Sequence, residues 1–182
     1  YVPQGARLFA GLGGMHVLCV LGMALLPGGV RPALQQGGAF GLGLILSLAA
    51  GALLDLRLPG GVLAPLIAAS VLVLAADNVL SHRLRGWRLA AVLAFGAVHG
   101  LALSAALAFF GLPPEHDLAA LAGFALGAGL AVLGVMAATV LARRLVRRVA
   151  GDARAARQLV TLPGSAVIAV LAVVWIAQRA VF

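Results

Sequence analysis

Residues 89–111 read LAAVLAFGAVHGLALSAALAFFG, an apolar run in which His99 is the only ionisable side chain. An α-helix rises about 1.5 Å per residue, so about 20 apolar residues cross a hydrocarbon layer about 30 Å thick. The run does not alternate polar and apolar residues, and an open sheet edge is not tolerated against lipid. We therefore predict a membrane-spanning helix here.

Similar apolar runs recur along the whole chain. We predict six spans, at about 8–26, 38–54, 61–80, 89–111, 118–142 and 159–178. Proline and glycine clusters separate some of them, at 27–29, 59–61 and 113–114, and arginine-rich segments separate the others, at 83–88 and 143–157. The expected fold class is an all-α integral membrane protein, with residues 1–182 forming one domain, a six-helix bundle.

The composition agrees with a membrane protein and argues against several soluble classes. Hydrophobic residues make up 63% of the chain and charged residues 10%, whereas soluble domains average about 25% charged residues. All thirteen basic residues are arginine, clustered between apolar runs, which fits membrane topology better than nucleic-acid binding. The sequence has no CxxC pair, phosphate-binding glycine loop or nucleophile–base set, so we do not expect an enzyme.

The distribution of arginine predicts the orientation. Ten arginines follow the first, third and fifth spans, and three, Arg7, Arg57 and Arg179, lie on the other side. Because positive residues are retained in the cytoplasm, both termini are predicted outside. An outside N-terminus beginning at Tyr1 agrees with a cleaved signal peptide or an exported preceding domain. Segment 143–157 is expected to be either a basic amphipathic segment on anionic headgroups or a solvated topology signal.

Few ionisable side chains lie inside the predicted spans. His16 lies about eight residues from the outer face and His99 about ten from the inner face, so the two imidazoles could meet. An intramembrane histidine is a candidate metal ligand or proton relay, and the alternative is a hydrogen bond to a carbonyl that joins two helices. Asp77 is expected either to pair with Arg83 or Arg85 or to act as an oxygen ligand or proton acceptor. Serines and threonines in the spans are expected to bond their own backbone.

A second ligand pattern lies in the first span. Met15, His16, Cys19 and Met23 fall close together, and the last three share one helix face at i, i+3 and i+7. Sulfur and imidazole ligands suit copper(I), although methionine and cysteine also fill ordinary helix contacts. Copper handling is therefore one hypothesis for this span.

Gly123 and Gly127 form a small-xxx-small pattern in the fifth span. Small residues at this spacing let two helix backbones approach closely. The pattern predicts a helix contact, either within the bundle or with a partner.

Several short motifs occur in a recognisable order. The fourth span contains Phe-Gly-x-x-His-Gly-Leu at 95–101, the third ends on Asp77-Asn78, and the last ends on Trp-x-x-x-Arg at 175–179. With Gly13 and His16 in the first span, this order resembles the HupE/UreJ family of six-helix bacterial membrane proteins, which are associated with nickel or cobalt uptake for hydrogenase and urease. The resemblance covers nearly the whole chain. It implies a place in the bacterial inner membrane and a metal site of His16, His99 and Asp77, with Cys19 as a further ligand.

The chain departs from the family pattern at four ligand-type positions. The leading histidine of the first span is Phe9, the aspartate is Met15, the histidine of the second span is Leu44 and the first glutamate of the third is Ala64. A hydrated divalent ion needs several fixed ligands to replace its water. The remaining residues therefore make a sparse site.

Two functional hypotheses follow. The first is nickel- or cobalt-type metal transport or delivery, with the lipid bilayer and the metal ion as partners. The second is a transport-inactive relative that serves as a structural or accessory subunit among partner membrane subunits. A transporter should bring His16 and His99 to one ion, whereas histidines bonded to backbone in a dry bundle would favour the second hypothesis.

Overall fold

The computed structural model describes residues 4–81, 83–110 and 117–180, with side chains for 13–81, 83–109 and 118–178. It contains helices α1 (Gln4–Ala24), α2 (Val30–Leu53), α3 (Gly60–Leu80), α4 (Gly86–Phe110), α5 (Asp117–Ala150) and α6 (Ala153–Ala156), a π-helical turn η1 (Arg157–Thr161) and α7 (Leu162–Ala180). The described residues contain no strand. The all-α prediction is confirmed.

The long helices have the length and composition of membrane spans. Helices α2, α3, α4 and α5, and the continuous helix from Ala153 to Gln178, are each long and apolar enough to cross a membrane. The described side chains of α1 add a shorter apolar stretch, Gly13–Ala24. The chain therefore has the character of a multi-pass membrane protein.

Helices α2 and α5 differ most from their predicted extents. Helix α2 begins at Val30 and not near residue 38, because Pro32 lies in its first turn, where the missing N–H costs no helical hydrogen bond. Helix α5 continues past residue 142 to Ala150, so the arginines at 143–148 are helical. It ends at Gly151, whose φ of 72° is a left-handed conformation that glycine adopts readily.

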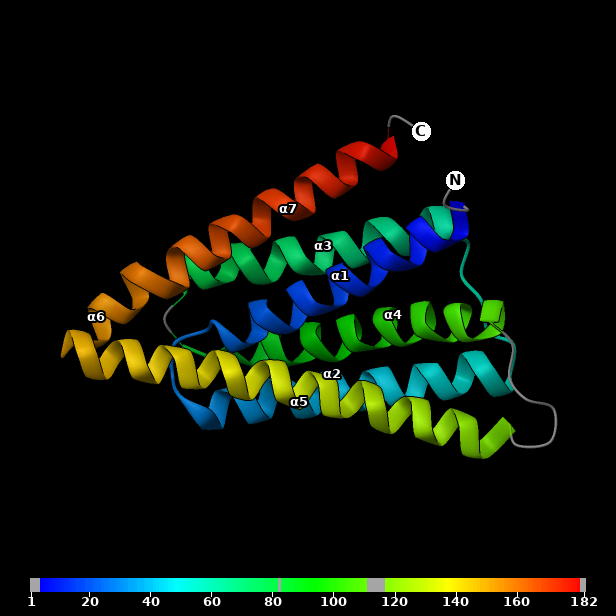
Figure 1. The fold of residues 1–182 in the computed structure, drawn as a ribbon, viewed down its shortest axis with the longest axis horizontal. Coiled ribbons are helices and arrows are strands. Elements are labelled where there is room, and N and C mark those ends of the chain that lie inside the picture. The colour runs from blue at the N-terminus through cyan, green and yellow to red at the C-terminus, as the bar shows by residue number, and fades with distance from the viewer. Residues whose placement is uncertain (1–3, 82, 111–116, 181–182) are drawn as a thin grey trace.

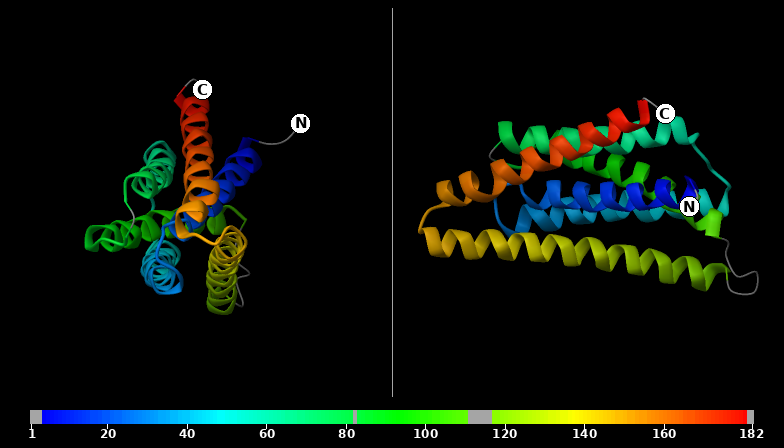
Figure 2. Two further views of the ribbon diagram at one scale, coloured as in Figure 1. Left: turned by 90° about the vertical axis from the view of Figure 1, so that its left-hand side faces the viewer. Right: turned by 45° about the horizontal axis from the view of Figure 1, so that its top comes forward.

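The helices lie alongside one another, and the connections gather at two ends (Figures 1 and 2). The α1–α2, α3–α4 and α5–α6 connections share one end, which we call the arginine-rich end, and the two chain termini lie toward the other (Figure 1). Helix α1 contacts α2, α3, α4, α5 and α7, so it is the central element of the bundle. Helix α7 packs mainly on α3.

Helices α2 and α4 form the closest pair through two stripes of small residues. The stripes are Gly43, Ser47 and Gly51 on α2 and Gly96, Gly100 and Ser104 on α4. A Cβ atom on Gly96 would lie 2.1 Å from the Phe40 carbonyl oxygen, and one on Gly100 would lie 2.2 Å from that of Leu44. The backbones therefore touch, as in small-residue contacts between membrane helices.

Gly123 and Gly127 behave differently. Both are exposed, and a Cβ atom on either would meet nothing within 4 Å among the described residues. The expected contact within the bundle is therefore wrong for this part of the chain. Contact with a partner helix stays a prediction.

We expect Gly100→Ala to lower the free energy of unfolding by about 1–3 kcal/mol, the usual cost of overpacking. The added methyl group meets a backbone carbonyl, which no rotamer change can move. Gly127→Ala is the matched control, and it should be neutral or slightly stabilising because alanine is the better helix former. Thermal unfolding in detergent measures both variants. Equal midpoints for the two would contradict the close α2–α4 contact.

Candidate functional site: a histidine pair inside the bundle

The structure brings His16 of α1 and His99 of α4 into direct contact. Their Nδ1 atoms are 3.1 Å apart, and the ring centroids are 5.0 Å apart with the planes inclined at 64°. His99 is buried, with 2% of its surface exposed, and His16 is partly buried. The two residues are 83 positions apart in the chain, so the fold itself builds the pair.

Ser70 of α3 fixes the orientation of His99. The Ser70 hydroxyl donates its one proton to the Ile67 carbonyl oxygen at 2.6 Å, and its oxygen lies 3.1 Å from His99 Nε2. His99 Nε2 therefore carries a proton and donates to Ser70. In a neutral His99 this leaves Nδ1 as an acceptor, which receives the Nδ1 proton of His16. The result is a directed chain of hydrogen bonds across α1, α4 and α3.

Two further side chains border the pair. The ring of Phe40, which is fully buried, lies 5.5 Å from the His16 ring and 5.4 Å from the His99 ring, between centroids. The Cys19 sulfur is 3.8 Å from the Ser70 oxygen, so the thiol belongs to the same cluster. His16 Nε2 has no hydrogen-bond partner among the residues that the structure describes.

The distance between the two Nδ1 atoms matches the distance between two nitrogen ligands of one metal ion. A first-row ion binds imidazole nitrogen at about 2.0–2.1 Å, so two neighbouring ligand nitrogens are about 2.9–3.4 Å apart. The observed 3.1 Å falls in this range. Moving the His16 proton from Nδ1 to Nε2 would leave two bare Nδ1 atoms beside one ion. A histidine ligand commonly donates its other ring N–H to a neighbouring group, as His99 does to Ser70.

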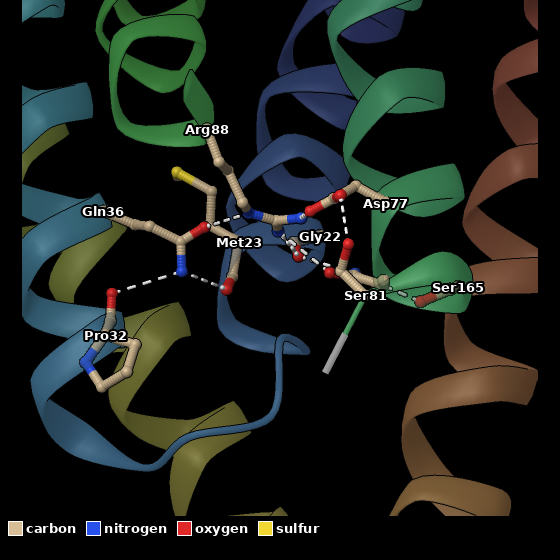
Figure 3. Close-up of polar contacts among 9 residues, drawn as sticks. Gly22, Met23, Pro32, Gln36, Asp77, Ser81, Arg88 and Ser165 are labelled. Atoms are coloured by element: carbon tan, nitrogen blue, oxygen red, sulfur yellow. Dashed lines mark hydrogen bonds and ion pairs between the residues drawn. The ribbon is translucent and has the colours of Figure 1, made fainter. Parts of the chain in front are cut away.

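Asp77 lies in a different cluster. Its carboxylate pairs with Arg88 of α4 and accepts a hydrogen bond from the Ser81 hydroxyl at 2.7 Å (Figure 3). The expected partners Arg83 and Arg85 are both exposed, so that prediction is corrected to Arg88. Asp77 joins helices near the arginine-rich end, and among the described residues its carboxylate bonds Arg88 and Ser81, not His16 or His99.

Arg88 is the centre of this second cluster, which we call the Arg88 network (Figure 3). Its guanidinium group is fully buried, and it donates to Gln36 Oε1 at 2.8 Å, to Asn78 Oδ1 at 2.9 Å and to the Gly22 carbonyl at 3.2 Å, besides Asp77. A planar cation with five donors suits such a site. Arg88 is therefore not part of the positive charge of the α3–α4 connection. Even without Arg88, the predicted cytoplasmic connections contain more arginines than the other side.

A family model described as HupE / UreJ protein matches residues 1–179. The chain belongs to the HupE/UreJ family. No curated protein and no solved structure matches it. Members of the family are membrane transport or accessory proteins and are not known enzymes.

In this HupE/UreJ protein, five successive carbonyls at the end of α1 are bonded to side chains from five other elements. The donors are Asn78 and Arg88 to Gly22, Gln36 to Met23, Arg143 to Ala24 and to Leu26, and Thr161 to Leu25. The last carbonyls of a helix lack partners of their own, and in a lipid environment they must find them in the protein. The end of α1 therefore holds the surrounding helices together at the arginine-rich end of the bundle.

The methionines of the copper hypothesis lie in the core of the HupE/UreJ bundle. Met15 and Met23 are buried among apolar side chains, as is Cys19. Among the described side chains there is no group of three or more His, Cys, Asp and Glu residues that could hold a metal ion. An ion bound by His16 and His99 would therefore need further ligands other than described His, Cys, Asp or Glu side chains.

The sequence does not predict several side chains of these clusters. Ser70 bonds its own backbone at Ile67, as predicted, but it also contacts His99. Thr161 bonds the Leu25 carbonyl instead of its own backbone, and Gln36 and Arg88 lie outside the predicted spans. The position of Arg88 in the sequence did indicate a buried partner. Arg88 directly precedes the apolar run 89–111, where a charged side chain needs a partner.

Proposed function

We propose that this HupE/UreJ protein passes or delivers a divalent metal ion of the nickel or cobalt type, with His16 and His99 as its intramembrane ligands. The 3.1 Å separation of the two Nδ1 atoms carries the proposal, because two helices distant in sequence place two nitrogen ligands at coordination spacing. The bond from His99 to Ser70 supports it, because it points His99 Nδ1 toward His16.

The sparse ligand set suits passage of an ion. Conduction requires that an ion bind strongly enough to enter and weakly enough to leave. Two imidazoles meet that requirement better than a full cage. Asp77 has no place in this proposal as a ligand, because Arg88 holds its carboxylate.

A second candidate function is an accessory subunit without transport. The observation that favours it is the lack of a three-ligand group in the described part of the chain. Copper handling through Met15, His16, Cys19 and Met23 is a lesser variant, because Met15, Cys19 and Met23 all pack in the apolar core.

The proposal includes an orientation. With the arginine-rich end in the cytoplasm of a bacterial inner membrane, both termini lie outside. A reporter enzyme that is active only outside the cytoplasm, fused after Phe182, should be active. If the reporter after Phe182 is inactive and a reporter fused in the α5–α6 turn is active, the orientation is the opposite of the one proposed.

Metal uptake in cells tests the function. In bacteria that lack their own nickel uptake, the wild-type protein should raise cell-associated nickel or cobalt, and His16→Ala and His99→Ala should each return it to background. Ser104→Ala is the matched control, because Ser104 is a buried polar residue of α4 that bonds only the Leu101 carbonyl. Undiminished uptake by both histidine variants would overturn the role of the pair. No uptake by a well-expressed wild-type protein would favour the accessory function.

A further inference from the structure

Two adjoining grooves lie near the arginine-rich end. The first, of about 330 Å³, runs between α2 and α5, and its lining is apolar except for Arg144. The second, of about 290 Å³, is bordered by the α1–α2 turn and by Arg143, Arg144, Arg147 and Arg157. Val140 and Arg144 line both grooves, so the two adjoin. An apolar groove therefore lies beside a basic one.

The charge of the basic groove is uncompensated. Within the described residues, ion pairs join only Arg57 to Asp55 and Arg88 to Asp77, so none of the four groove arginines has an acidic partner. Arg143 bonds the carbonyls of Ala24 and Leu26, which accept hydrogen bonds but carry no negative charge. An anion in the groove would therefore be strongly favoured.

Two buried donors in the same groove lack acceptors. The Nε atoms of Arg143 and Arg157 are both buried without a hydrogen-bond partner in the described structure. A buried donor left unpaired costs about 1–3 kcal/mol, so these two side chains are held at some cost. The exposed guanidinium groups of Arg144 and Arg147 are the ones that a phosphate can reach, since arginine pairs with phosphate through several N–H groups.

The position of the groove matches that of a lipid headgroup. The apolar part of α5 ends at Leu141-Ala142, and Arg143 and Arg144 follow at once. Arginines directly after an apolar span lie at the headgroup level. From there the apolar groove continues along α2 and α5 past Met136 and Leu133, in the direction of an acyl chain.

We propose that this site binds one anionic phospholipid, with its phosphate among Arg143, Arg144, Arg147 and Arg157 and one acyl chain in the α2–α5 groove. An apolar groove beside a basic one fits an amphiphile. The four arginines without acidic partners favour a negative headgroup over a zwitterionic one. The site is separate from the histidine pair and does not depend on metal transport.

Native mass spectrometry of the detergent-solubilised protein, with dioctanoyl phosphatidylglycerol and dioctanoyl phosphatidylcholine as probes, tests the proposal. The wild-type protein should retain one phosphatidylglycerol, at least about tenfold more tightly than phosphatidylcholine. Arg144→Gln/Arg147→Gln should abolish this preference. Both side chains are exposed and form no hydrogen bond within the described structure, so the variant should fold. Arg148→Gln, also exposed on α5 but outside the groove, is the control.

A second pair of variants tests the acyl-chain groove. Ala137→Trp fills the apolar groove and should weaken the binding of both lipids at least about tenfold, whereas Ala138→Trp, also exposed but outside the groove, should weaken the binding of neither. Equal binding of the two lipids, an equal loss in Arg148→Gln, or competition by inorganic phosphate at the lipid's own concentration would each overturn the proposal.

Discussion

Arg88→Met is expected to lower the free energy of unfolding by about 3–5 kcal/mol, the cost of removing one partner from a buried ion pair. The substitution leaves the Asp77 carboxylate, 6% exposed, without its counter-ion. It also removes the donors to Gln36 and Asn78, so α2, α3 and α4 lose their shared contact. Unfolding in a detergent series with increasing dodecyl sulfate measures the change.

Arg85→Met is the matched control for this prediction. Arg85 is exposed and lies one turn before Arg88, so its loss should change stability by less than about 0.5 kcal/mol. Adding Asp77→Asn to Arg88→Met should restore part of the stability, because the stranded charge disappears. An Arg88 variant as stable as the Arg85 variant, or a double variant no better than Arg88→Met alone, would contradict the role of the Arg88 network.

His99→Ala is expected to reduce nickel affinity of the purified protein by about 100-fold or more, because it removes one of two imidazole ligands that the fold places together. Ser70→Ala should reduce affinity by about 10–100-fold, the usual effect of losing a group that orients a ligand. Isothermal titration in detergent gives both values. In the proposal Ser70 does not bind nickel itself. A lower affinity of Ser70→Ala would therefore show that the orientation of His99 matters for binding.

Ser104→Ala serves as the control for both variants. It removes a buried hydroxyl from the same helix as His99, and this hydroxyl hydrogen-bonds only its own backbone at Leu101. Nickel affinity should therefore be unchanged. If His99→Ala binds nickel as the wild-type protein does while remaining folded, the pair joins helices and does not hold an ion.

The sequence was sufficient for the helices but not for all of their ends. Uninterrupted apolar runs determine α3 and α4, because only helices satisfy the backbone in lipid. The sequence predicts the start of α2 eight residues too late, because Arg31, Gln35 and Gln36 are typical of a polar loop. Hydropathy does not distinguish a polar residue facing solvent from one, like Gln36, that bonds the end of a neighbouring helix.

The candidate site was predicted only in part for a related reason. His16 and His99 were identifiable because each stands alone in an apolar run, and depth along the helix made their meeting plausible. Ser70 and Arg88 depend on which face of a helix points inward, and α3 and α4 are apolar on nearly all faces. With no apolar stripe to orient these helices, partners such as Asp77 and Arg88 could be found only in three dimensions.

X-ray absorption spectroscopy of the nickel-loaded protein tests the central claim most directly, because it reports the atoms bound to the ion. We predict scattering from two imidazole rings in the wild-type protein and from one ring in His16→Ala or His99→Ala. A ligand shell without imidazole, or one unchanged by both substitutions, would contradict the account.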